Sequence, residues 1–218
     1  MRAVLLDFNG TMFFDASLNI EAWSKIYQDL HPEDTEPLNM ARVFGANNRA
    51  VLQNLAPWLT DEENQAYSEK KEVLYRRACL TKPETTRLVT GTEAFMRYLS
   101  DSGIPYALAS ASIKSNIDFF FDVFGLDRWF EKEQVVYDDG TYADKGAMHL
   151  EAAHRLNVDL ADCLLIEDSP GSIAHAKRNG AGCIVAIGNS APCSVLFEKG
   201  ADYYMKDFSD FDCAWLQF

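Results

Sequence analysis

The sequence predicts an α/β fold in which helices cover both faces of a parallel, Rossmann-like sheet. Four short apolar runs have the length of buried strands, and they occupy residues 3–8, 105–109, 162–166 and 182–187. Helical patterns alternate with these runs, at residues 93–100, 113–124, 146–156 and 172–179. Fully apolar strands that alternate with amphipathic helices are typical of a parallel sheet that is buried on both sides.

A separate region with helical periodicity and no convincing strand lies between the first two of these strands. Its apolar residues recur three or four positions apart, as they do on one face of a helix. We therefore predict a helical cap over residues 15–88, which is inserted into an α/β core formed by residues 1–14 and 89–218.

The boundaries inside and around the cap also leave signals in the sequence. Linkers near residues 13–17 and 83–89 are expected to join the cap to the core. Thr60 precedes three consecutive acidic residues, 61–63. This pattern predicts a helix that Thr60 caps, with the carboxylates near the positive end of the helix dipole.

Polar residues follow the predicted strands, and the first of them is Asp7. It stands between an apolar run and the turn Asn9-Gly10-Thr11. A carboxylate at the carboxyl end of a buried strand is a ready nucleophile or metal ligand. The amides of Gly10 and Thr11 beside it are expected to bind substrate. Read by itself, the same segment is also compatible with a simple Asp/Asn turn.

The second predicted strand ends in Ser110-Ala111-Ser112. The hydroxyl of Ser110 and the amide of Ala111 are suited to bind a phosphate oxygen, because turns before helices present unpaired N–H groups. For Ser112 we expect the simpler role of N-cap of the helix that follows.

Two charged segments come later in the chain. Lys145 begins an amphipathic helix, a position where lysine is usually solvated. Glu167 and Asp168 are adjacent at the end of the third apolar run. Paired carboxylates at a strand end are unfavourable unless a cation joins them, and Mg²⁺ is the natural candidate for oxygen ligands.

Taken in order, these segments resemble the motifs of the haloacid-dehalogenase superfamily, in its β-phosphoglucomutase-like branch of phosphatases and phosphomutases. The family pattern is D-x-D-G-T, then a Ser or Thr after a strand, then a Lys, then an acidic pair such as E-D-S. The matching segments of this chain are Asp7-Phe8-Asn9-Gly10-Thr11, Ser110, Lys145 and Glu167-Asp168-Ser169. The resemblance covers nearly the whole chain and implies the same core with an inserted cap.

The resemblance also implies a reaction. Asp7 would attack a phosphoryl group and form an aspartyl phosphate, while Ser110 and Lys145 hold phosphoryl oxygens. Mg²⁺ would be bound by Asp7, by the carbonyl of Asn9 and by Asp168. Glu167 would bind the metal directly or through water.

Two positions depart from the family pattern. Asn9 stands where the phosphatases and mutases carry the Asp that serves as general acid and base, and an amide cannot transfer that proton. The lysine motif is also altered: alignment of the helix after it puts Ala143 at the usual lysine position. Lys145 must therefore reach the site from two residues further on.

The predicted cap contains a loop, residues 44–49, at the position where the family places a substrate-specificity loop. Asn47, Asn48 and Arg49 offer hydrogen bonds and one cation for a second phosphate or sugar hydroxyls. A plain helix–helix connection explains the loop equally well. The four histidines, His31, His149, His154 and His175, lie outside the motifs, and we assign none of them a catalytic role.

Three functions remain open at this point. The first is Mg²⁺-dependent phosphoryl transfer, by a phosphatase or phosphomutase, on a small phosphorylated metabolite such as a sugar phosphate. The second is a phosphate-binding or regulatory protein whose turnover is attenuated by Asn9. The third is haloacid dehalogenation by Asp7, against which the Glu167–Asp168 pair argues.

Composition limits the partners and the compartment. The formal charge of −13 over 218 residues argues against nucleic acid or an anionic membrane as a partner. The five cysteines lack zinc-site spacing, and their odd number fits poorly with a disulfide framework; Cys163 and Cys183 are expected in the core. With no signal sequence or long apolar run, we expect a reduced, cytoplasmic, monomeric enzyme.

Overall fold

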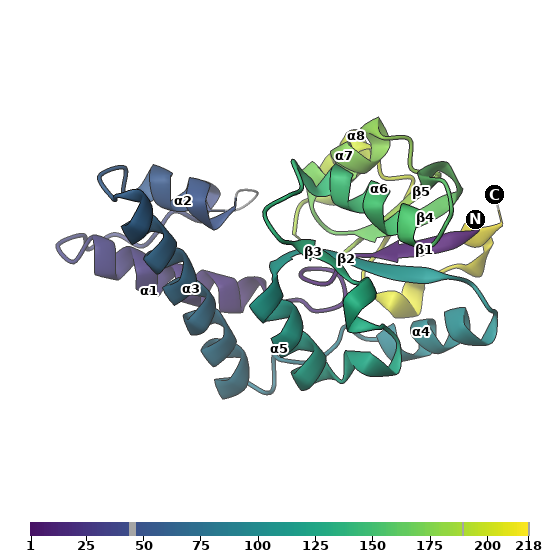
Figure 1. Cartoon of the computed structure of the whole chain (residues 1–218), viewed down its shortest axis with the longest axis horizontal. Coiled ribbons are helices and arrows are strands. Elements are labelled where there is room, and N and C mark those ends of the chain that lie inside the picture. Colours follow the sequence, from purple (N-terminus) through teal and green to yellow (C-terminus); the bar gives the residue numbers. More distant parts are fainter. Residues whose placement is uncertain (44–46, 189, 218) are drawn as a thin grey trace. The chain divides into compact units, whose positions relative to one another are not determined.

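The computed structural model describes residues 1–43, 47–188 and 190–217. The chain divides into two compact units (Figure 1). One unit comprises residues 1–14 and 87–218, and the other comprises residues 15–86. We call the first the α/β unit and the second the helical unit.

The α/β unit is built on a six-stranded parallel sheet, which confirms the predicted fold class. The strands lie in the order β3-β2-β1-β4-β5-β6. They are β1 (Ala3–Leu6), β2 (Tyr106–Ile113), β3 (Val136–Asp138), β4 (Cys163–Glu167), β5 (Cys183–Ile187) and β6 (Tyr203–Met205). The four predicted runs correspond to the central strands β1, β2, β4 and β5. The edge strands β3 and β6 were not predicted, because three residues are too few to show a periodic pattern.

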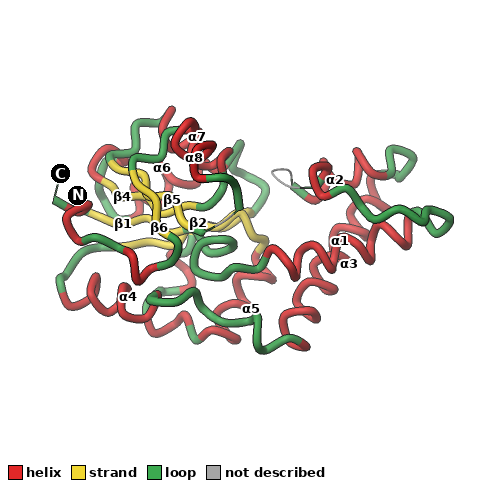
Figure 2. The backbone as a smooth tube through the Cα atoms, turned by 180° about the vertical axis from the view of Figure 1, so that it is seen from behind, coloured by secondary structure: helices red, strands yellow, loops and turns green. Residues whose placement is uncertain are grey.

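Helices cover both faces of this sheet, as Figures 1 and 2 show. On one face lie α4 (Thr92–Asp101) and α5 (Lys114–Phe124). On the other lie α6 (Lys145–Arg155), α7 (Pro170–Arg178) and α8 (Cys193–Lys199). Helix α8 was not predicted from the sequence, and it has only seven residues.

The core on the α6–α8 side joins Leu5 of β1 and Leu165 of β4 to Met148, Ile173 and Leu196 of the three helices. Cys163 and Cys183 are buried, as predicted, and all five cysteines are free. Short 3₁₀ turns complete the chain at Met40–Arg42, Leu126–Arg128, Lys132–Gln134, Leu160–Asp162, Phe208–Asp210 and Cys213–Leu216.

The helical unit consists of α1 (Ala16–Leu30), α2 (Asn48–Leu55) and α3 (Asp61–Thr81). Trp23 and Ile26 of α1 pack against Leu52 and Leu55 of α2 in its core. Helix α1 already begins at Ala16, so the last two residues of the first expected linker are helical. Among the described residues, no helix is both long enough and apolar enough to cross a membrane.

An aromatic cluster fixes the turn that follows β1. Phe8 lies 4.5 Å from Phe120 and 5.4 Å from Phe124 between ring centroids, and Phe13 lies 4.9 Å from Phe124. The backbone of the turn is closed by the N–H of Gly10, which donates to the carbonyl of Phe13 at 2.7 Å. Residues 9–11 are therefore held between two buried aromatic anchors.

The start of α3 was predicted correctly. Thr60 accepts a hydrogen bond from the N–H of Glu63 at 3.2 Å, and the Glu63 carboxylate accepts one from the N–H of Thr60 at 2.9 Å. This reciprocal pair is a capping box, and it satisfies two backbone donors at the helix terminus.

Thr60→Ala removes one half of this cap and should lower the free energy of unfolding by about 1 kcal/mol. Urea unfolding followed by circular dichroism measures the loss. Thr81→Ala is the matched control, because Thr81 is exposed in the last turn of the same helix and should change stability by no more than about 0.5 kcal/mol. Equal losses in the two variants would contradict the capping role.

Candidate active site

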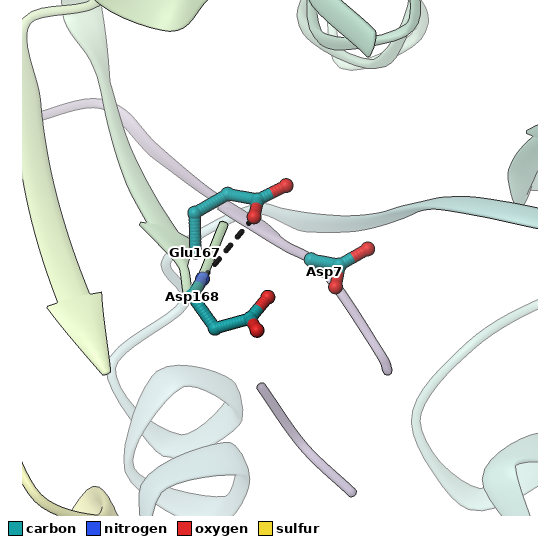
Figure 3. A group of neighbouring side chains, drawn as sticks. All are labelled: Asp7, Glu167 and Asp168. Carbon is teal, nitrogen blue, oxygen red and sulfur yellow. Dashed lines mark hydrogen bonds between the residues drawn. The ribbon is translucent and has the colours of Figure 1, made fainter. Parts of the chain in front are cut away.

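The strand register brings the predicted acidic residues together. In the parallel pairing of β1 with β4, Leu6 lies opposite Ile166, so Asp7 and Glu167 leave the sheet side by side. The N–H of Asp7 donates to the carbonyl of Ile166 at 3.2 Å. Asp7, Glu167 and Asp168 gather at this edge, and each offers one oxygen within 4.8 Å of the others (Figure 3).

Gly10 leaves room for the third carboxylate. Its φ of +77° is a conformation that side chains rarely allow. A Cβ at this position would lie 2.2 Å from Oδ2 and 2.4 Å from Cγ of Asp168. The absence of a side chain therefore lets the Asp168 carboxylate rest against the turn after β1.

Lys145 reaches the site, although its position in the sequence is displaced from the family pattern. It is the first residue of α6, whose N-cap is Asp144; that carboxylate accepts from the N–H of Ala147 at 3.0 Å. The Lys145 ammonium donates to Oδ1 of Asp7 and, at 2.8 Å, to the carbonyl of Ala109. It also lies 3.5 Å from Oε1 of Glu167.

The pKa values report a crowded, buried site. Burial raises the pKa of Asp7 to about 7; Lys145 opposes this shift and the charge of Glu167 adds to it. Burial acts against ionisation of Glu167 as well, but Lys145, His149 and Ser172 outweigh it and lower the pKa to about 2. Burial disfavours the Lys145 ammonium, yet Asp7 and Glu167 overcome this and raise its pKa.

Within this cluster the charges do not cancel. If all three carboxylates are ionised, one ammonium faces them and two negative charges are left uncompensated. A divalent cation would balance them, and the donors are all carboxylate oxygens, the type that Mg²⁺ prefers. The residues present therefore fit a magnesium ion.

Protein donors occupy both oxygens of Glu167. Oε2 accepts from the N–H of Asp168 at 3.1 Å and of Ser169 at 3.4 Å, and Oε1 accepts from Oγ of Ser172 at 2.6 Å. The protein itself thus holds the Glu167 carboxylate in place.

The side chain of Asn9 is held by two serines in the last part of β2. Its Oδ1 accepts from Oγ of Ser112 at 2.7 Å and from Oγ of Ser110 at 3.5 Å. The expectation that Ser112 caps α5 is wrong: the N-cap is Ile113, since β2 runs on to that residue. Ala111 is exposed, within an irregularity in the pairing of β2 with β3.

The amides of the β1 turn are engaged within the turn itself. The N–H of Gly10 donates to Phe13, as described above, and the N–H of Thr11 donates to the carbonyl of Phe8 at 3.2 Å. The Thr11 hydroxyl is fully buried and has no hydrogen-bond partner among the described residues. A substrate role for Gly10 and Thr11 stays a prediction.

Asn47, Asn48 and Arg49 belong to the helical unit, whereas residues 44–46 of the same loop lie outside the described residues. All three side chains have partners inside that unit. Asn47 caps α2 by accepting from Ala50 at 2.9 Å, Asn48 donates to Glu72 at 2.7 Å, and Arg49 donates to Asp61 at 2.7 Å. Their predicted contacts with substrate remain untested.

Sequence reasoning missed two residues behind the carboxylates, His149 and Ser172. His149 is 1% exposed, and its Nε2 lies 3.6 Å from Oε1 of Glu167. Burial lowers its pKa, although Glu167 acts in the opposite direction. One signal was available, because His149 follows Lys145 by four residues, which places both side chains on one face of a helix.

A family model described as a haloacid dehalogenase-like hydrolase matches residues 1–180. The chain belongs to this family. It is 25% identical to the beta-phosphoglucomutase of Bacillus subtilis (strain 168), over 96% of this chain and 91% of that protein. It is 23% identical to the phosphoglycolate phosphatase of Aquifex aeolicus (strain VF5), over 86% and 85% of the two chains.

A solved structure gives the same result for the fold. The HAD hydrolase of family IA, variant 3, from Entamoeba histolytica HM-1:IMSS superposes with a TM-score of 0.90 and 25% identity. The match covers 100% of this chain and 98% of that one. Family and relatives together indicate an enzyme of the phosphatase or phosphomutase type.

Gly10→Ala tests whether the β1 turn controls the metal site. The added Cβ must displace the Asp168 carboxylate, and we expect Mg²⁺ affinity, measured by calorimetry, to fall about tenfold or more. Gly140→Ala is the control: its φ is +83°, but its Cβ would meet no atom within 4 Å. Equal losses would show a general effect of a strained backbone on the protein, and not an effect of the displaced carboxylate.

Proposed function

We propose that this protein catalyses Mg²⁺-dependent phosphoryl transfer on a small phosphorylated metabolite through an aspartyl phosphate at Asp7. The observation that carries the proposal is the setting of Asp7. It is a buried carboxylate that follows a central strand and accepts a hydrogen bond from Lys145. Two further carboxylates, at the end of a neighbouring strand, lie close to it. The names of the relatives, which include a phosphoglucomutase and a phosphoglycolate phosphatase, support this substrate class.

In this proposal a carboxylate oxygen of Asp7 attacks phosphorus and the bond to the leaving oxygen breaks. Water, or a hydroxyl of a second substrate, then attacks the phosphorus of the aspartyl phosphate and restores the carboxylate. Lys145 and Ser110 hold phosphoryl oxygens, and Lys145 also reduces repulsion between the incoming phosphate and the carboxylates.

Asp7, Asp168 and the backbone carbonyl of Asn9 would hold Mg²⁺, and Glu167 would act on it through water. When bound, Mg²⁺ would supply positive charge that neutralises the phosphoryl group and the carboxylates. A metal-dependent reaction is favoured over dehalogenation by the three clustered carboxylates, since displacement of a halide by Asp7 needs no cation.

Asn9 limits the reaction in this proposal. Its amide N–H is too weak an acid to protonate a leaving alkoxide, and its oxygen is too weak a base to accept a proton from an attacking water at neutral pH. The second candidate function, an attenuated phosphate-binding or regulatory protein, rests on this residue.

The helical unit would serve as the cap, with Asn47, Asn48 and Arg49 as its predicted substrate residues.

The direct test is release of inorganic phosphate across a panel of sugar phosphates, phosphoglycolate and an aryl phosphate. We expect release only with Mg²⁺, and fastest from the aryl phosphate, whose leaving group needs little protonation. Asp7→Asn should abolish release and the phosphorylated protein seen by mass spectrometry. Asp101→Asn, at an exposed position in α4, is the control. Release by the Asp7 variant at the parent rate would refute the aspartyl phosphate.

Asn9→Asp restores a group that can carry a proton. Turnover of alkyl phosphates should rise by about 100-fold or more, since a positioned acid or base contributes roughly 10²- to 10⁴-fold. Turnover of the aryl phosphate should rise much less. The ratio of the two rates separates proton transfer from a general gain in binding. A variant no faster than the parent on any alkyl phosphate, at saturating Mg²⁺, would favour the regulatory function.

A further inference from the structure

Three buried side chains next to Lys145 form a chain of hydrogen bonds. They are His149 on α6, Ser172 on α7 and Glu167 at the end of β4. Their exposed fractions are 1%, 6% and 1%. A buried histidine is more costly than an apolar residue of similar size unless its polar atoms are used.

The direction of the hydrogen bonds follows from the number of protons available. Ser172 has one hydroxyl proton, and it donates this proton to Oε1 of Glu167 at 2.6 Å. Toward Nε2 of His149, 3.4 Å away, Ser172 must therefore act as acceptor. The proton of the neutral imidazole is then on Nε2, and Nδ1 carries a lone pair.

The surroundings of Nδ1 agree with this tautomer. Nδ1 of His149 is buried and has no hydrogen-bond partner among the described residues. A proton there would be a buried donor without an acceptor, which is costly. His149 therefore donates to Ser172, and Ser172 donates to Glu167.

The same oxygen of Glu167 faces the lysine. Oε1 lies 3.5 Å from Nζ of Lys145 and 3.6 Å from Nε2 of His149, while Oε2 is fixed by the amides at the start of α7. Oε2 is therefore held by the backbone. The orientation of Oε1 depends on the Ser172 hydroxyl, which His149 holds in turn.

We propose that His149 is a positioning residue for phosphate binding, which acts through Ser172 and Glu167 to hold the Lys145 ammonium in place. This role rests on the proposed function, because it assumes that Lys145 binds phosphoryl oxygens. His149 itself touches neither phosphate nor metal.

The test measures the affinity of the whole protein for inorganic phosphate by calorimetry at saturating Mg²⁺. His149→Leu removes the donor and should weaken phosphate binding about tenfold, the effect of one hydrogen bond in a charged network. His149→Gln keeps an N–H donor and should bind within about threefold of the parent. His154→Leu, the same change at a largely exposed position of α6, should bind as the parent does.

A double-mutant cycle shows whether the effect passes through Lys145. In a Lys145→Met background, His149→Leu should cause no further loss, because the group that it positions is gone. Equal losses in both backgrounds, or a Gln variant as weak as the Leu variant, would show a general structural role and overturn the proposal. So would a Leu variant that binds phosphate like the parent.

If His149→Leu does not fold, the Gln variant and Ser172→Ala replace it. The Gln variant must then bind phosphate as the parent does, and Ser172→Ala must weaken phosphate binding about tenfold, the loss expected of the Leu variant.

A parent that binds no phosphate would overturn the proposed function and this inference with it. A parent that binds phosphate with unaffected His149 and Ser172 variants would overturn the inference alone.

Discussion

The site depends on the register of the central strand β1. Leu6 lies opposite Ile166 on one side and opposite Leu108 on the other. The next residues of the three strands, Asp7, Glu167 and Ala109, are therefore level with one another at the carboxyl end of β1. In a pleated sheet a shift by one residue would turn every side chain of β1 to the opposite face. The side chains of Ala3 and Leu5 are buried in the core on the α6–α8 side, and such a shift would place side chains of other sizes in that core.

The site then concentrates more negative charge than its surroundings can neutralise. Lys145 compensates one charge, and the start of α7 stabilises Glu167 through two backbone amides and the positive end of the helix dipole. Asp7, by contrast, keeps a pKa raised by burial. Such an arrangement lowers the stability of the fold and is suited to a divalent cation, whose two positive charges would restore the balance.

Asn9 is the residue at which this site departs from the family's first motif. The groups proposed to bind phosphate and metal are arranged around Asp7, and Ser110 and Ser112 of β2 hold the Asn9 amide by its oxygen. A carboxylate at the same position would accept the same two hydroxyl protons. In the proposed mechanism Asn9 therefore keeps these local hydrogen bonds and lacks only the capacity for proton transfer, so binding and turnover are expected to be separable.

The sequence by itself determined the α/β class, the central strands, the capped start of α3 and the three acids of the site. Apolar runs of strand length indicate a buried sheet whatever the order of its strands. A carboxylate that ends such a run must emerge at the carboxyl end of the strand. Only the tertiary structure decided the edge strands β3 and β6, whose three residues become strands through pairing with a neighbour. It also decided the reach of Lys145 to Asp7, the bond of Ser112 to Asn9 and the burial of His149 behind Glu167. These contacts join residues far apart in the chain, and their distances are set by packing, which no local pattern encodes.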